Sequence, residues 1–388
     1  ILQLRGGSGV VTAMVSQQIH LRARQPGCVW PAVPILLAAV LIHTPCSANE
    51  AASPKRTSGL LSDRFARPMT VGRSRVAAFE NKLRGKIANF YDKSSTVWEE
   101  IWGEHMHHGY YPGGKWRKDH KQAQIDMIDE VLKWAGVKAP HTVIDVGCGV
   151  GGSLRHIARK YRSVSTGKGI TLSPFQRDRA EALTKEADKS DKAKGRKRLG
   201  RKLGFEVADA MDMPYRANAF DLAWSMESGE HIPDRPRFIK EIKRVVRPGG
   251  RVIVVTWCQR NLEPDETELK PREKRLLNWV SRLYHLPEWW SIDDYTKCAK
   301  DLGLRDIRTA DWSKEISPFW PAVVQSALTP KGLIGLFRAG PETMAGALTM
   351  GLMITGYRQK VIRFNLMTAR KATRTERLLS SLGLGGKA

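Results

Sequence analysis

A glycine-rich run, VIDVGCGVGG at residues 143–152, is the first feature of the sequence that could do chemistry. Gly147 and Gly149 belong to a G-x-G-x-x-G spacing, which lets the backbone approach either a dinucleotide or S-adenosylmethionine. Asp145 precedes them, where a carboxylate would repel a pyrophosphate but could hold the ammonium group of S-adenosylmethionine. Helix N–H groups from Gly151 onward could meet the cofactor's carboxylate. The run therefore favours S-adenosylmethionine.

Two further segments complete the cofactor site that the sequence predicts. Asp209 follows a strand-like run and could receive the adenine amino group. The second strand-like run lacks the acid that usually binds ribose, so Thr171, Leu172 and Gln176 would have to contact the ribose and adenine. The residues that we expect to bind the cofactor are Tyr91, Asp145, Gly147, Cys148, Gly149, Gly151, Thr171, Leu172, Gln176, Asp209, Ala210, Met211 and Ser225.

A second cluster could move protons. Glu227, Glu230 and His231 place two carboxylates and an imidazole within five residues, just after a predicted fourth strand. An imidazole with a pKa near neutrality suits a general base, and a carboxylate would orient it. We therefore predict that these three residues are catalytic, with His231 as the base. The alternative is that Glu230 and His231 only cap the following helix.

Histidines also gather in the loop at residues 105–112. His105, His107 and His108 suggest a metal at first sight, but no carboxylate or cysteine has the spacing of a partner ligand. We expect no metal, and interpret the loop as a lid over the cofactor, with Tyr91 closing on the methionine end.

Strand-like and helix-like runs alternate through the middle of the chain, which predicts an α/β fold with a doubly wound, Rossmann-like parallel sheet. In such sheets, ligands bind at the carboxyl ends of the strands, where both clusters fall. The basic segment Lys185–Lys202 reads as a solvated loop, with a contact to anionic membranes as the alternative. The predicted strands are Thr142–Val146, Val164–Leu172, Leu203–Ala208, Phe220–Ser225, Arg251–Trp257 and Val361–Met367. The predicted helices include Lys118–Trp134, Gly152–Tyr161, Pro174–Ala187 and Pro236–Val246.

Composition limits the classes of protein to which this chain can belong. The chain has 388 residues, a formal charge of +25 and 41% hydrophobic residues, which indicates a globular protein and excludes an intrinsically disordered one. No run reaches the roughly 18–20 apolar residues of a membrane span, so a multi-pass membrane protein is excluded. The five cysteines are dispersed, which favours free thiols over a disulfide framework or a zinc site.

Residues 1–78 read as a targeting leader that is removed. They hold nine basic residues and two acids. From Met14 a basic stretch, the apolar run Ala32–Ile42 and small residues form the pattern of a secretory signal, and Asn49–Ala78 resembles a transit peptide. This two-part order is typical of delivery to plastids wrapped in extra membranes. A disordered tail is the alternative.

The C-terminal part suggests a lipid substrate and a contact with a membrane. The apolar run Met344–Tyr357 has 14 residues, too few to span a bilayer, and could line a tunnel for an isoprenoid tail or form a plain helical core. Residues 358–388 hold eight basic residues and one acid, and a cationic tail beside an apolar cap suits peripheral attachment to an anionic membrane. Nucleic acid is the other acidic partner, but no binding motif supports it, so we expect none.

Several blocks together resemble the γ-tocopherol C-methyltransferases. They include FYDKSSTVWEEIWGEHMHHGYYPGG, VIDVGCGVGGS, GITLSPFQRDRA, FDLAWSMESGEHIPD, RVVRPGGRVIVVTWC and SPFWPAVVQSALTPKGL, in order over roughly residues 79–371. The resemblance implies a seven-stranded class I methyltransferase with a helical N-terminal lid (79–118), a cofactor-binding core (119–257), a C-terminal substrate cap (258–360), and a last strand with a basic tail (361–388).

The same resemblance implies a reaction. It is the S-adenosylmethionine-dependent C-methylation of γ- and δ-tocopherol to α- and β-tocopherol, the last step of vitamin E synthesis, in a plastid and in contact with its membrane. Related N-methyltransferases of plant alkaloids share nearly all of these blocks, so a small amine remains the alternative acceptor.

Overall fold

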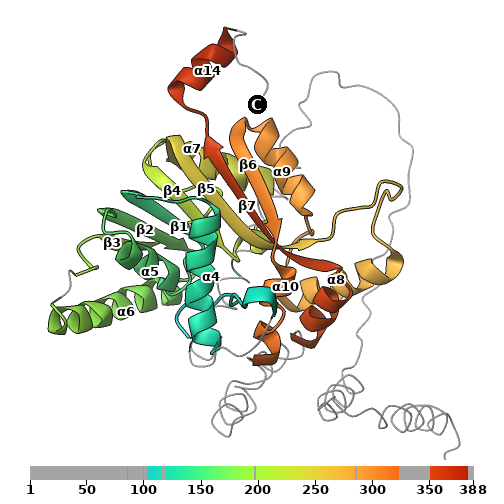
Figure 1. Cartoon of the computed structure of the whole chain (residues 1–388), viewed down its shortest axis with the longest axis horizontal. Helices are drawn as coiled ribbons and strands as arrows, with labels where there is room; N and C mark the ends of the chain where they lie inside the picture. The colour runs from blue at the N-terminus through green and yellow to red at the C-terminus, as the bar shows by residue number, and fades with distance from the viewer. Residues whose placement is uncertain are drawn as a thin grey trace, which may run out of the picture. The chain divides into compact units, whose positions relative to one another are not determined.

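The computed structural model describes residues 103–114, 119–195, 198–284, 286–322 and 350–382, together with Gly85 and Glu99. All of them belong to one compact unit, Arg67–Ala388 (Figure 1). The predicted leader, Tyr91 and most of the predicted lid lie outside the described residues.

Seven strands among the described residues form one sheet in the order β3-β2-β1-β4-β5-β7-β6. Strands β1 to β5 pair in parallel, and β7 pairs antiparallel with both β5 and β6. The predicted seven-stranded, Rossmann-like sheet is therefore confirmed. The strands are β1 (Thr142–Val146), β2 (Thr166–Thr171), β3 (Leu203–Val207), β4 (Phe220–Met226), β5 (Val246–Gln259), β6 (Leu304–Asp311) and β7 (Ile362–Lys371).

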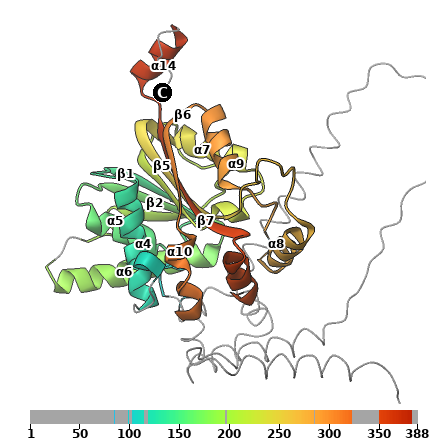
Figure 2. The same cartoon turned by 45° about the vertical axis from the view of Figure 1, so that its right-hand side comes forward.

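Helices cover both faces of the sheet. The labelled ones are α4 (His120–Trp134), α5 (Gly152–Lys160), α6 (Pro174–Ala193), α7 (Arg235–Val245), α8 (Pro271–Tyr284), α9 (Ile292–Asp301), α10 (Ser313–Ile316) and α14 (Arg374–Ser381), with short 3-10 turns η1 (Pro112–Gly114) and η2 (Gly229–His231). Figure 2 shows α4 and α5 on one side of the sheet and α7 and α9 on the other.

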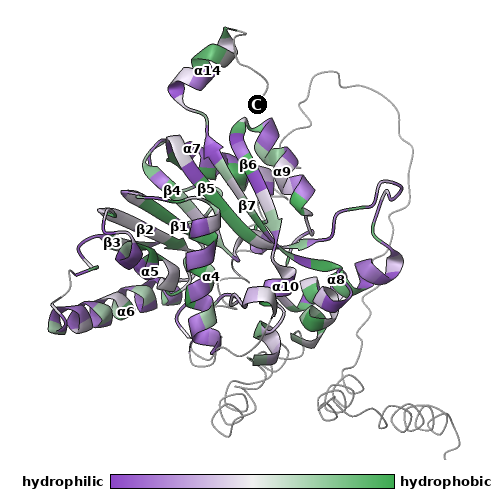
Figure 3. Cartoon of the chain, viewed as in Figure 1, coloured by the Kyte–Doolittle hydropathy of each residue, from purple (hydrophilic) through white to green (hydrophobic). Residues whose placement is uncertain are grey.

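The strands are hydrophobic on both faces because both are covered. In β1, Val143 packs into the core under α4 and α5, whereas its neighbour Ile144 packs into the core under α7. Figure 3 shows the resulting concentration of hydrophobic residues along the central strands, with hydrophilic residues on the outer faces of the helices. This two-sided packing fixes the strand ends that carry the candidate site.

The loop prediction for Lys185–Lys202 is wrong in its first half, because α6 continues to Ala193. Two acids bind the helix to its surroundings. Asp191 is buried and pairs with Arg159 on α5 at 3.3 Å, and the carboxylate of Asp188 accepts hydrogen bonds from backbone N–H groups that follow the helix. These contacts hold the first half of the basic run in a helix. The number of charged residues alone does not reveal them.

The basic tail starts directly after Tyr357 of the apolar run, and its later part, from β7 onward, leads away from that run. Strand β7 runs antiparallel to β5, so it carries the chain across the sheet to the edge opposite the carboxyl ends of the parallel strands. Helix α14 leaves the fold at that opposite edge (Figure 1). Among the described helices, none is both long enough and apolar enough to cross a bilayer.

Candidate active site

A cavity lies at the carboxyl ends of the parallel strands, where the sequence placed both clusters. Its wall is built from the glycine loop after β1, the ends of β2, β3 and β4, and the described part of the predicted lid. The lining residues are His105, Met106, His107, Asp145, Gly147, Cys148, Gly149, Ser153, Ile170, Thr171, Leu172, Ser173, Gln176, Ala208, Asp209, Ala210, Met211, Met226, Glu227, Ser228, Glu230, His231, Ile232, Pro233, Trp257 and Tyr284.

The structure brings the two predicted clusters together. All three predicted catalytic residues line this cavity, as do ten of the thirteen residues predicted to bind the cofactor. The ten are Asp145, Gly147, Cys148, Gly149, Thr171, Leu172, Gln176, Asp209, Ala210 and Met211.

The three exceptions differ in kind. Tyr91 lies outside the described residues, and neither Gly151 nor Ser225 lines the cavity. Gly151 begins α5 with a left-handed backbone (φ 79°). Ser225 lies 2.7 Å, oxygen to oxygen, from the hydroxyl of Ser228, which donates to the carbonyl of Val146. Both residues thus support the loop that forms the wall.

The glycine loop is tight because it folds back on β2. The N–H groups of Gly147 and Cys148 both donate to the carbonyl of Ile170 at 2.9 Å. Gly147 has a φ of 78°, and a Cβ there would lie 2.3 Å from the Cβ of Ser228. Only glycine fits this position, and the backbone is left open to a ligand.

Asp145 offers the clearest fit to a cationic ligand. Its side chain is buried, and Oδ2 has no hydrogen-bond partner among the described residues. Burial raises the pKa of this carboxyl to about 7. A buried carboxylate oxygen without a partner is costly. The ammonium group of S-adenosylmethionine would satisfy it, so this position fits the cofactor.

The ribose side of the site is preformed. The hydroxyl of Thr171 donates to Oε1 of Gln176 at 2.7 Å, and the carboxylate of Asp209 accepts from the N–H of Met211 at 2.9 Å. These bonds fix Thr171 and Gln176, which we predicted to contact the ribose and adenine, and Asp209, which we predicted to receive the adenine amino group.

Glu227 follows β4 with an unusual backbone (φ 50°) and a fully engaged carboxylate. Oε1 accepts from the backbone N–H of His108 at 2.6 Å. Oε2 lies 2.7 Å from Nδ1 of His108 and accepts from Nε1–H of Trp257 at 3.0 Å. Burial opposes ionisation, yet His108 holds the pKa of Glu227 below its ordinary value. The carboxylate is therefore ionised and fixed in place.

Glu230 has the opposite character. Burial and then the charge of Glu227 raise its pKa to about 8. One oxygen accepts from the hydroxyl of Thr256 at 2.9 Å, and the other, Oε1, has no hydrogen-bond partner among the described residues. Two carboxyl groups with pKa values driven apart can divide the roles of acid and base.

The hydrogen bonds of Glu227 described above do not include His231. His231 ends η2 and lines the cavity, but the hydrogen bonds of Glu227 go to His108 and Trp257. The histidine that a carboxylate orients is His108, which the sequence suggested only as part of the lid.

The contact of His108 with Glu227 is the feature of the site that sequence reasoning missed. His108 is completely buried and lies within 4.9–6.1 Å, centroid to centroid, of five aromatic rings. The rings belong to Trp257, Phe319, Trp320, Tyr357 and Phe364. A buried titratable group needs a partner, so a buried histidine indicates that a partner exists. The sequence does not reveal which residue it is, because Glu227 lies 119 residues away from His108.

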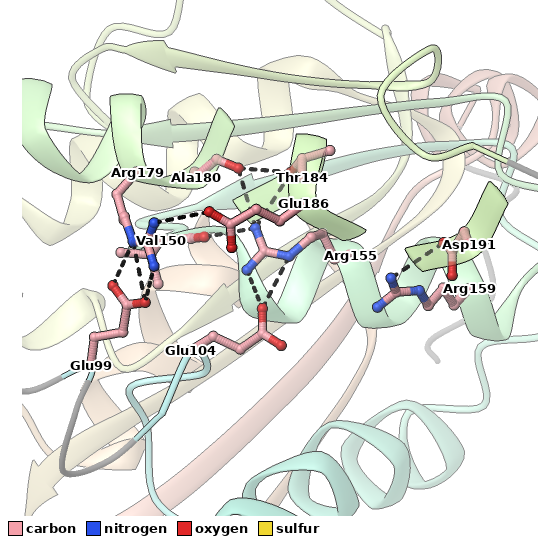
Figure 4. A network of polar contacts seen from close by, with 10 residues as sticks. All are labelled: Glu99, Glu104, Val150, Arg155, Arg159, Arg179, Ala180, Thr184, Glu186 and Asp191. Carbon is pink, nitrogen blue, oxygen red and sulfur yellow. Dashed lines mark hydrogen bonds and ion pairs between the residues drawn. The ribbon is translucent and has the colours of Figure 1, made fainter. Parts of the chain in front are cut away.

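Ion pairs attach the segment around His105 to the core, as Figure 4 shows. Glu104 pairs with the buried Arg155 of α5, whose guanidinium also donates to the carbonyl of Val150 at 2.8 Å. Glu99 pairs with Arg179 of α6 at 2.7 Å. The segment is thus held against the two helices that follow the glycine loop and β2. No group of three potential metal ligands occurs within the described ranges.

Comparison with known proteins identifies the cofactor. Residues 144–254 match a family described as "Methyltransferase domain". A solved structure of the [4+2]-cyclase SpnF superposes with a TM-score of 0.59 at 24% identity, covering 74% of this chain and 95% of that one. A geranyl diphosphate C-methyltransferase from Streptomyces coelicolor A3(2), solved with S-adenosyl-L-homocysteine, superposes with a TM-score of 0.56 at 18% identity, covering 75% and 98%. The cofactor is S-adenosylmethionine.

Curated relatives identify the family. The chain is 51% identical to a probable tocopherol O-methyltransferase of Oryza sativa subsp. japonica, over 76% of this chain and 80% of the relative. It is 47% identical to a tocopherol O-methyltransferase of Arabidopsis thaliana, over 76% and 84%. Both are named chloroplastic, which supports a plastid location. A norajmaline N-methyltransferase of Rauvolfia serpentina is 33% identical, over 74% and 97%. The chain therefore belongs to the tocopherol methyltransferase family of S-adenosylmethionine-dependent enzymes.

Proposed function

We propose that the protein methylates a ring carbon of γ-tocopherol and δ-tocopherol, giving α-tocopherol and β-tocopherol. The names of its relatives and the resemblance over roughly residues 79–371 support a tocopherol substrate. The names say O-methyltransferase, but α-tocopherol differs from γ-tocopherol by a methyl group on a ring carbon. The acceptor atom is therefore carbon.

The observation that carries the proposal is the pair of carboxyl groups in the cavity, Glu227 ionised and Glu230 with its pKa raised to about 8. The methyl group leaves the sulfonium for the ring carbon ortho to the phenol, and that carbon then loses its proton. Drawing off the phenolic proton raises the electron density of the carbon, a task for His231, because Glu230, with its pKa raised to about 8, keeps its own proton at neutral pH. Methyl transfer to the resulting phenolate would give a neutral dienone and S-adenosylhomocysteine, and the ionised carboxylate of Glu227 would take the proton that the methylated carbon releases.

An assay of radiolabelled methyl transfer tests this proposal. It offers γ-tocopherol, δ-tocopherol and a panel of small alkaloid amines to the same enzyme, because the similarity to norajmaline N-methyltransferase makes an amine the second candidate acceptor. We expect label in α- and β-tocopherol. Label only in an amine would refute the proposal. The Glu227→Gln variant is the control, since it keeps the shape of the side chain and removes its charge.

The same proposal includes a peripheral contact with the plastid membrane. A prenyl lipid dissolves in the bilayer, so an enzyme acting on it gains from lying at the membrane surface. Residues 79–388, with 55 basic and 37 acidic residues, keep a formal charge of +18 without the leader, which favours an anionic surface. The proposed two-part leader is tested by a fluorescent fusion of residues 14–80, for which a cytosolic signal would be the refuting result.

A further inference from the structure

Helix α8 has two unlike faces. Its inner face packs Leu277, Val280 and Tyr284 into the core, and Tyr284 also lines the active-site cavity. Its outer face exposes four residues at helical spacing, which we call the arginine–tryptophan face. The face consists of Arg272, Arg275, Trp279 and Arg282.

Trp279 is unusual for its exposure. More than half of its surface, 54%, is open, although Phe319 and Trp320 elsewhere in the same part of the chain are completely or almost completely buried. The guanidinium of Arg282 lies over its ring, 5.9 Å from the centroid. An exposed tryptophan beside basic side chains is typical of the boundary between water and lipid headgroups.

The acids near α8 do not neutralise this face. Glu273 is buried and pairs with Arg260, which also pairs with Glu266. Glu268, in the preceding loop, pairs with Lys274. Among the described residues, none of the three arginines of the arginine–tryptophan face has a carboxylate partner, so three guanidinium groups remain available to an anionic surface.

We propose that the arginine–tryptophan face of α8 is the surface through which the protein binds a membrane that contains anionic lipids. Guanidinium groups suit bidentate contacts with phosphate headgroups, and the indole suits the interface below them. The inference rests on the proposed prenyl-lipid substrate, and it assigns that substrate an approach along the helix whose last residue, Tyr284, reaches the cavity.

A second exposed apolar surface could also bind a membrane, but its position in the fold argues against this role. Helix α14 exposes Leu378 and Leu379, and Leu382 directly after it is also exposed, with exposed fractions of 60%, 40% and 61%. It leaves β7 at the edge of the sheet opposite the cavity (Figure 1). A membrane bound there would lie at the end of the fold away from the site that takes the lipid.

Flotation of the full chain with phosphatidylcholine vesicles, made with and without phosphatidylglycerol, tests the surface. The double variant Arg275→Gln/Arg282→Gln should lower partitioning onto the anionic vesicles about 30-fold, from about fivefold for each basic side chain. Trp279→Ala should reduce binding to both kinds of vesicle. The matched control, Arg162→Gln/Arg216→Gln, removes two exposed arginines from loops that precede β2 and β4.

Three flotation results would overturn the proposal. The α8 double variant could float as the wild type does, or the control could lose as much binding as the α8 variant, or flotation could depend on the leucines of α14 alone. A gel shift with nucleic acid that the α8 variant loses, while its flotation stays unchanged, would also overturn it and assign the face to nucleic acid.

Measurements of methylation rate distinguish a failure of this inference from a failure of the proposed function. The α8 double variant should lose rate on γ-tocopherol embedded in anionic vesicles and keep the wild-type rate on a chromanol that lacks the tail and is dissolved in buffer. Equal losses on both substrates would overturn the role of the face. A wild type that methylates neither substrate would refute the proposed function, while flotation would still decide whether α8 binds the membrane.

Discussion

Replacing His108 with phenylalanine tests whether its ring keeps Glu227 ionised. The change preserves an aromatic ring among the five that surround it and removes the Nδ1 donor that lies 2.7 Å from Oε2. The backbone N–H of residue 108 and the indole of Trp257 still donate to the carboxylate. The perturbation is thus one charge-assisted hydrogen bond.

The magnitude follows from that bond. Losing a hydrogen bond to a charged group costs about 1.5–3 kcal/mol, which corresponds to an increase of about 1–2 units in the pKa of Glu227. If catalysis requires the ionised form, the acidic limb of the kcat/KM profile should move to higher pH by the same amount. The rate should fall most near pH 5–6, and recover toward pH 8, because the carboxyl ionises there without help.

Stability gives an independent reading of the same bond. The pKa of Glu227 is lowered in the folded protein, so its interaction with His108 stabilises the fold above the unfolded pKa of about 4.3 and is lost as the pH falls through the folded value. The difference in free energy of unfolding between the wild type and His108→Phe should therefore be largest at neutral pH and shrink in acid.

A conservative variant separates hydrogen bonding from packing. His108→Asn places an amide N–H near the position of Nδ1 and should restore the acidic limb, although it fills the aromatic pocket less well. An acidic limb that does not move in His108→Phe would refute the reasoning. So would equal losses of rate in both variants at every pH, because the ring would then act through packing alone.

Variants of four other residues give further predictions for the site. The affinity for S-adenosylhomocysteine, measured by calorimetry, should rise with pH through about 7 as Asp145 ionises, and Asp145→Asn should abolish that dependence and weaken binding about 10–100-fold; an unchanged affinity would contradict the assigned ammonium contact. Gly147→Ala should abolish cofactor binding because its Cβ would overlap Ser228; normal binding would show that the loop relaxes. His231→Ala should lower the rate at neutral pH about 10²–10⁴-fold with unchanged cofactor affinity; a stable His231 variant with normal turnover across pH 6–9 would exclude His231 as the base. Glu230→Gln should remove the limb near pH 8 from the pH–rate profile.

The elements that the sequence predicted well are those determined by local pattern. The glycine loop and β1 were predictable because the loop needs left-handed backbone at Gly147 and because β1 is a short apolar run. Strand β6 was not predicted, since it is an edge strand whose residues are mostly half-buried or exposed and carry charges throughout. Its pairing with β7, rather than its own pattern, makes it a strand.

The candidate site was predictable in position but not in pairing. Strand ends bring Asp145, Glu227 and His231 to one edge of the sheet whatever their side chains contact. The partner of Glu227 depends on where a loop 119 residues earlier lies in space. Neighbours in sequence, such as Glu230 and His231, gave no indication that Glu227 pairs with His108.

If residues 105–108 act as the proposed lid, their contacts have a kinetic consequence. His105, Met106 and His107 line the cofactor cavity, and the next residue, His108, holds the carboxylate of Glu227. Because consecutive residues cover the cofactor cavity and hold Glu227, a loop that opens to admit the cofactor must also break its contact with Glu227. The cofactor should therefore bind before the acceptor and its product leave last. In steady-state kinetics, S-adenosylhomocysteine should inhibit competitively against S-adenosylmethionine and noncompetitively against the acceptor, whereas a random order of addition would give competitive patterns against both.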